Sequence, residues 1–209
     1  MFPPDILTAY LLAALLVVVA PGPDNLLAMS RGMSQGWQAA ALSATGAGLG
    51  IMAHTIAATF GLTLILRTSP MAFWMVKAAG GAYLLWLGYQ AIVSHRLIAF
   101  AAGQHLPLGR VFLTGLLSNL LNPKPGLFVV AFIPQFVSDS RGSVAAQMLG
   151  YGALFALLTA LAFSIMGAWA AGLADWLAKR PRAVVAANRG AGIAFIAAGL
   201  SVLTLDHRQ

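Results

Sequence analysis

The sequence predicts an all-helical membrane protein, and three observations carry that prediction. First, 60% of the 209 residues are hydrophobic and only 8% are charged, whereas about 25% of residues are charged in a typical soluble domain. Second, six apolar segments are long enough to cross a bilayer, which takes about 20 residues. Third, the first and the fourth of these segments are each interrupted by a Pro-x-Pro unit, Pro21-Gly22-Pro23 and Pro123-Lys124-Pro125.

The six expected spans follow one another with mostly short connections. They cover roughly residues 6–30, 40–66, 70–93, 111–138, 144–172 and 185–205. The longest connection, 94–110, divides the chain into two halves of three spans, 1–93 and 111–205. Because three is an odd number, the second half inserts upside-down, which gives an inverted repeat about an axis in the membrane plane. We therefore expect a single transmembrane domain over 1–209 with a cytoplasmic linker at 94–110.

The interruption of the first and fourth spans is the main pointer to a site. Proline lacks a backbone N–H and clashes with the carbonyl four residues back, so a helix cannot pass through Pro-x-Pro unbroken. In hydrocarbon the freed backbone groups need partners, so such a break must face protein or a polar cavity. Interrupted helices in matching halves are typical of a transporter's binding site. The polar residues around these breaks are Asp24, Asn25, Asn119, Asn122 and Lys124.

Three ionisable residues within the spans each allow two interpretations. Asp24 follows Pro23, where it could cap the second half-helix or bind a substrate ammonium or a proton. Lys124 lies near the middle of its span, where it could snorkel to water or pair with a substrate carboxylate. His54 lies on the face of the second span that carries small residues, where it is a packing group or a proton carrier.

Small residues follow one face of the second span and one face of the fifth. Such residues let helix backbones approach closely in lipid. The matching pattern supports the repeat, although ordinary helix packing would also explain it. The two sets are Gly46, Gly50, Ala53, Ala57 and Gly61, and Ala153, Ala156, Ala160, Ser164, Gly167 and Ala171.

The distribution of basic residues predicts the orientation. Positive loops face the cytoplasm, and the more basic side holds the odd-numbered loops, so both termini are predicted to be periplasmic. The odd-numbered loops hold Arg31, Arg96, Arg110, Lys179, Arg180, Arg182 and Arg189, whereas the opposite side holds Arg67, Arg141 and Arg208, with Lys77 close to it. A net charge of +7 therefore indicates topology and contact with anionic lipid rather than nucleic acid.

Several classes of site are not expected. The chain has no cysteine, which excludes disulfides and thiolate metal sites. The run Gly32-Met33-Ser34-Gln35-Gly36 matches Gly-x-Ser-x-Gly, but a nucleophile elbow needs a strand before it and a helix after it. We predict no enzyme activity, no cofactor and no bound metal.

Four stretches resemble the LysE/RhtB family of amino-acid exporters, which includes exporters of threonine, homoserine and leucine. Together they extend over nearly the whole chain. They are Pro21-Gly22-Pro23-Asp24-Asn25-Leu26-Leu27; the run from Gly46 to His54 with Gly61-Leu62; Lys77-Ala78-Ala79-Gly80-Gly81-Ala82-Tyr83-Leu84-Leu85-Trp86-Leu87-Gly88; and Gly115 through Asn122-Pro123-Lys124 to Ile133-Pro134-Gln135-Phe136-Val137.

The resemblance implies export of a small amino acid or a derivative across the bacterial inner membrane in exchange for protons. We expect the Asn122–Lys124 break to bind the substrate carboxylate, Asp24 with Asn25 to bind the ammonium, and Asp24 or His54 to carry the proton. The alternative is a metal or other ion transporter on the same scaffold. The expected partners are the substrate, protons and lipid, and a homodimer is left open. Pro125 and a charged residue at Asp24 depart from the family pattern.

Overall fold

The computed structural model describes residues 2–20, 22–68, 70–93, 104–170, 172, 176 and 180–204, and this part of the chain is helical without a strand. The long helices are α1 (Pro4–Val19), α2 (Pro23–Gln35), α3 (Trp37–Thr68), α4 (Pro70–Val93), α5 (Leu108–Leu121), α6 (Pro123–Ala131), α7 (Val144–Ala168) and α9 (Pro181–Thr204). Two short 3-10 helices, η1 (Ile133–Phe136) and η2 (Asp139–Arg141), connect α6 to α7.

Both predicted interruptions are present. α1 and α2 meet at 63°, and α5 meets the segment Pro123–Phe136 at 54°. Pro23 and Pro123 are the first residues of α2 and α6, a position where the missing N–H would have no partner inside the helix. Pro21 lies outside the described residues. Pro125 was predicted to break a helix, and this prediction is wrong. Pro125 is part of the first turn of α6, where backbone N–H groups have no partner within any helix.

The structure shows which residues of the two breaks correspond. In the sequence the two Pro-x-Pro units begin at Pro21 and Pro123. In the structure Pro23 and Pro123 hold the same position, since each begins the half-helix after a break. Asp24 and Lys124 are then both the second residue of their half-helix. The two halves therefore carry opposite charges at equivalent positions.

Two helical stretches of the described residues are long and apolar enough to cross a membrane. One is Trp37–Gly61, which is part of α3, and the other is α7. The count rises to as many as four if each bent pair is one span. α4 coincides with the predicted 70–93, whereas α5 begins inside the predicted linker 94–110, most of which lies outside the described residues. Six spans in two inverted halves remain a prediction.

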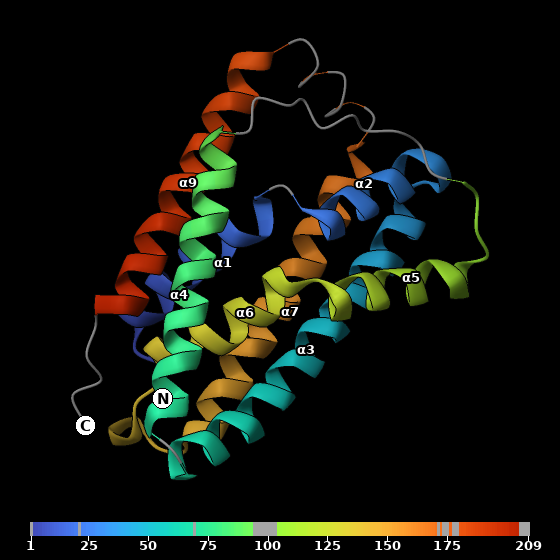
Figure 1. Ribbon diagram of the computed structural model, residues 1–209. Coiled ribbons are helices and arrows are strands. Elements are labelled where there is room, and N and C mark those ends of the chain that lie inside the picture. The colour runs from blue at the N-terminus through green and yellow to red at the C-terminus, as the bar shows by residue number, and fades with distance from the viewer. Residues whose placement is uncertain are drawn as a thin grey trace.

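Packing divides the helices into two groups (Figure 1). α3 packs against α5 and α7, while α4 and α9 pack against each other. Glycines bring these backbones together: Gly115 of α5 lies against Ser43 of α3, and Gly32 of α2 lies against Gly167 of α7. Of the small residues predicted to pack in α3, Gly46 and Gly50 do face α5.

Hydrogen bonds connect the end of the linker, just before α5, to side chains of α2. Gln35 donates from Nε2 to the carbonyl of Leu106 at 2.7 Å and accepts from the Leu106 N–H at 2.9 Å. Arg31 donates to the carbonyl of Gln104 at 2.7 Å. These bonds hold the start of α5 beside the end of α2, so they tie the two broken helices together at one end.

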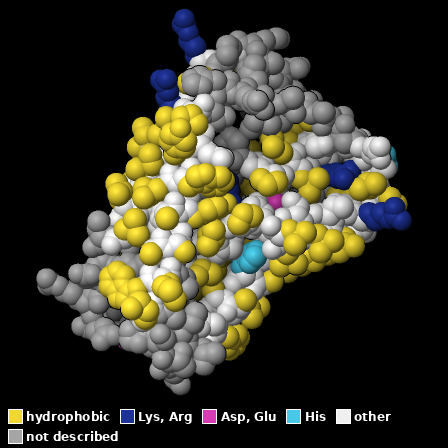
Figure 2. Space-filling view, in the orientation of Figure 1, with side chains coloured by type: hydrophobic (Ala, Val, Ile, Leu, Met, Phe, Trp, Pro, Cys, Tyr) yellow, Lys and Arg dark blue, Asp and Glu magenta, His cyan; other side chains and the backbone are white. Residues whose placement is uncertain are grey.

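The outer surface is strongly apolar. Figure 2 shows hydrophobic side chains over most of the described surface in that view, with a histidine and an acidic side chain near the middle. Large apolar residues are exposed on several helices, among them Leu121, Phe60 and Trp169 at 82%, 69% and 72%. Exposed apolar surface of this extent marks a face that meets other apolar matter, such as lipid.

Candidate functional site

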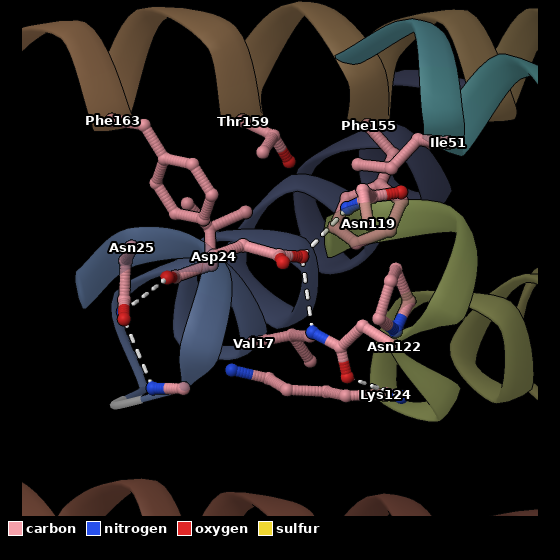
Figure 3. A pocket seen from close by; sticks show the side chains of 13 residues that line it. Val17, Asp24, Asn25, Ile51, Asn119, Asn122, Lys124, Phe155, Thr159 and Phe163 are labelled. Atoms are coloured by element: carbon pink, nitrogen blue, oxygen red, sulfur yellow. Dashed lines mark hydrogen bonds between the residues drawn. The ribbon is translucent and has the colours of Figure 1, made fainter. Parts of the chain in front are cut away.

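A pocket lies where the two breaks meet, and it holds about 300 Å³ of empty space, part of it open to the outside. Its walls come from α1, α2, α3, α5, α6 and α7 (Figure 3). Five predicted polar residues line it, Asp24, Asn25, Asn119, Asn122 and Lys124, and so do Gly22 and Pro125 from the predicted helix breaks. The structure thus brings together polar side chains that stand about a hundred positions apart in the sequence.

The carboxylate of Asp24 is the centre of the site. Asp24 is buried, at 7% exposure. Its Oδ1 accepts from the hydroxyl of Ser118 at 2.6 Å, and its Oδ2 accepts from the amides of Asn119 at 2.7 Å and Asn122 at 3.0 Å. All three donors come from the other half of the chain. An ionised carboxylate has about four acceptor positions, so one position on Oδ1 is left for a ligand.

Lys124 crosses between the halves in the opposite direction. Its Nζ donates to the backbone carbonyl of Ala20, at the end of α1, at 2.7 Å. A cation is favourable at a helix C-terminus, where the carbonyl groups are free. An ammonium has three donors, so two are left for other partners. The ammonium also lies 5.8 Å from the centre of the Phe195 ring of α9.

Asn25 and Asn122 hold the breaks themselves. Asn25 accepts from the N–H of Gly22 at 2.9 Å and donates to the carbonyls of Ala20 and Val18 at 3.0 and 3.4 Å. Both amide hydrogens of Asn25 are therefore used within the first break. Asn122 caps α6 by accepting from the N–H of Lys124 at 3.0 Å, and its amide nitrogen is left to bond Asp24.

His54 lies outside the pocket lining but is connected to it. Its Nε2 is 3.2 Å from the backbone carbonyl of Asn119, and a carbonyl oxygen only accepts, so Nε2 carries a proton. The imidazole ring also lies against Gly126 in the first turn of α6. Because Asn119 donates its side-chain amide to Asp24, His54 reaches the carboxylate only through Asn119.

Several residues of the site were not predicted from the sequence. Ser118 is the closest donor to Asp24, and Phe155, Thr159 and Phe163 of α7 line the far wall of the pocket. Ser118 could have been found, because it precedes Asn119 and lies one helical turn before Asn122. The α7 residues gave no such signal, since their spacing is that of any packed helix face.

Comparison with known proteins gives a consistent result. The sequence profile described as "LysE type translocator" matches residues 15–205. A homoserine/homoserine lactone efflux protein of Salmonella typhi is 31% identical over 205 residues, which are 95% of this chain and 96% of that protein.

Two further relatives carry other substrate names. A leucine efflux protein of Enterobacter sp. (strain 638) is 27% identical over 90% of both chains. A threonine efflux protein of Salmonella typhi is 32% identical over 73% of this chain and 75% of its own length. No solved structure matches this chain.

Proposed function

The chain belongs to the LysE family of amino-acid efflux transporters, and we propose that it exports a small zwitterionic amino acid in exchange for protons. One observation carries the proposal: the carboxylate of the first break binds donors from the second break, and the ammonium of the second break binds the first. A zwitterion carries both of these charges, so it could replace both cross-connections.

The two charged residues indicate how the substrate is oriented. The open acceptor position of Asp24 suits the substrate ammonium, and the two unused donors of Lys124 suit the substrate carboxylate. Asn119 and Asn122 would hold Asp24 in position for this exchange. Asn25 is more simply explained as the cap of the first break, since both of its amide hydrogens bond the backbone there.

Competition for Asp24 explains how the protons could be coupled. A buried carboxylate at 7% exposure is costly to keep charged unless it is paired. On the periplasmic side a proton would neutralise Asp24 and displace the substrate ammonium. On the cytoplasmic side, where protons are scarcer, the ammonium of a new substrate would replace the proton. One site then exchanges proton for substrate, and His54 would modulate it through Asn119.

The membrane arrangement predicted from the sequence is consistent with export from the cytoplasm. We propose an inner-membrane protein of six spans in two inverted halves, 1–93 and 111–205, with both termini in the periplasm and lipid around the apolar surface. The alternative function, transport of a metal or another ion, is not supported by the names of the reported relatives. A family of efflux transporters implies that the chain is not an enzyme.

The experiment is a flux measurement in proteoliposomes that contain the purified full-length chain. A panel of radiolabelled amino acids is tested with and without an imposed pH gradient, beside cadmium and zinc ions. We expect at least one small neutral amino acid to accumulate only when the gradient is imposed, and no metal flux. Metal flux without amino-acid flux would contradict the proposal, and so would amino-acid accumulation that ignores the pH gradient.

A further inference from the structure

Thr159 of α7 is a buried hydroxyl without a partner. Its exposure is 2%, and its Oγ1 is among the buried polar atoms that have no hydrogen bond. Threonine in a helix usually donates to its own backbone one turn back. Thr55 and Thr59 of α3 do so, donating to the carbonyls of Ile51 and Thr55 at 2.8 and 2.7 Å. Thr159 does not follow this pattern.

The free hydroxyl points into the pocket from an otherwise apolar wall. Thr159 stands between Phe155 and Phe163, each four residues away on the same face of α7 (Figure 3). Ile51 of α3 and Val17 of α1 complete this apolar part of the lining. The wall therefore accepts a small apolar group but leaves one buried hydroxyl unsatisfied, which costs free energy unless a ligand bonds to it.

Asn119 Oδ1 is the other unpartnered polar atom in the lining. It lies against Gly50 of α3, where even a Cβ would collide with it. The amide nitrogen of Asn119 is engaged by Asp24, so the side chain cannot turn without losing that bond. Thr159 is thus the group on this wall that a substrate side chain can reach.

We propose that Thr159 makes the transporter select amino acids whose short side chain carries a hydroxyl group. This inference rests on the proposed function, because it assumes that the amino and carboxyl groups of the substrate lie at Asp24 and Lys124. The side chain of the substrate then extends toward α7. A hydroxyl both donates and accepts, so it can pair with Thr159, while the aliphatic carbons pack between Phe155 and Phe163.

The test uses pairs of amino acids that differ by hydroxyl against methyl: threonine with valine, and homoserine with norvaline. Fluxes are measured in proteoliposomes for the full-length chain and for Thr159→Val, Thr159→Ser and Thr55→Val. One neutral hydrogen bond corresponds to a preference of about three- to tenfold. We expect the parent and Thr55→Val to prefer the hydroxylated member of each pair, Thr159→Val to lose that preference, and Thr159→Ser to keep it.

The flux measurements distinguish failure of the proposed function from failure of the role of Thr159. If the parent carries no amino acid, the proposed function is wrong. If it carries amino acids but Thr159→Val keeps the parent's preference, only the role of Thr159 is wrong. Should Thr159→Val fail to fold, the parent decides: equal fluxes of threonine and valine, and of homoserine and norvaline, would overturn the inference.

Discussion

Asp24 and Lys124 hold the same position in the two half-helices but use it differently. Asp24 accepts three hydrogen bonds from side chains of the opposite break, whereas Lys124 donates to a backbone carbonyl there. The charge of Asp24 is thus stabilised by side chains of α5 and of the second break. Separation of the two halves would remove these donors from Asp24 and would also break the bond from Lys124 to Ala20.

Replacing Lys124 by methionine removes the cation but keeps an unbranched side chain of similar size. We expect Lys124→Met to weaken substrate binding by about 1–3 kcal/mol, because a charged hydrogen bond to the substrate carboxylate is lost. The measurement is the KM for export in proteoliposomes, together with the yield of folded protein. Arg110→Met is the matched control, since Arg110 is exposed at the start of α5. Normal transport by Lys124→Met would mean that Lys124 only connects α6 to the end of α1 through its bond to Ala20.

At the residue scale the sequence predicted the charged members of the site and the asparagines beside them, but not Ser118 or the α7 residues. An ionisable residue in a span is informative by itself, because it is costly there. Thr159 is informative only through what it faces, and that depends on how α7 is rotated against α2. Its role therefore needed the structure.

The elements of the site are short half-helices held by close backbone contacts. α2 is fixed to α7 where Gly32 meets Gly167, and its other end is held by the hydrogen bonds of Asn25 across the break. The positions of both breaks could be predicted, since proline chemistry is local. The correspondence between the prolines of the two breaks could not be predicted, because the residue that begins α2 or α6 depends on the cap before it.

Gly32→Ala tests the contact between α2 and α7. A Cβ at this position would collide with the backbone carbonyl of Gly167, and forcing extra atoms into a packed contact costs about 1–3 kcal/mol. We expect a lower midpoint of thermal unfolding in detergent. Gly109→Ala is the control, because nothing lies within 4 Å of a Cβ there. Equal midpoints for the two variants would show that α2 is not held at Gly32.

For the whole molecule, the predicted orientation decides the direction of transport. α1 begins and α9 ends toward the same end of the molecule (Figure 1), which is the arrangement expected for the six predicted spans. The positive-inside pattern predicts that this end is periplasmic. The pattern could be read from the sequence alone, whereas the bend of the two broken spans could not.

The orientation can be tested by labelling, because the chain has no cysteine. We expect His207→Cys, near the C-terminus and outside the described residues, to react with an impermeant thiol reagent added to intact cells. His105→Cys, on the exposed linker before α5, should react only after the membrane is broken. The reverse pattern would invert the proposed topology.

The most direct test of the central claim is flux through Asp24→Asn, since the claim is that proton and substrate share one carboxylate. Asparagine keeps the size of aspartate but cannot bind and release a proton. In proteoliposomes with an imposed pH gradient, we expect Asp24→Asn to lose accumulation while weak exchange of substrate persists, and His54→Gln to retain most of the accumulation. If Asp24→Asn accumulates substrate against its gradient as the parent does, Asp24 only holds α2 to Ser118, Asn119 and Asn122 through hydrogen bonds, and coupling occurs elsewhere.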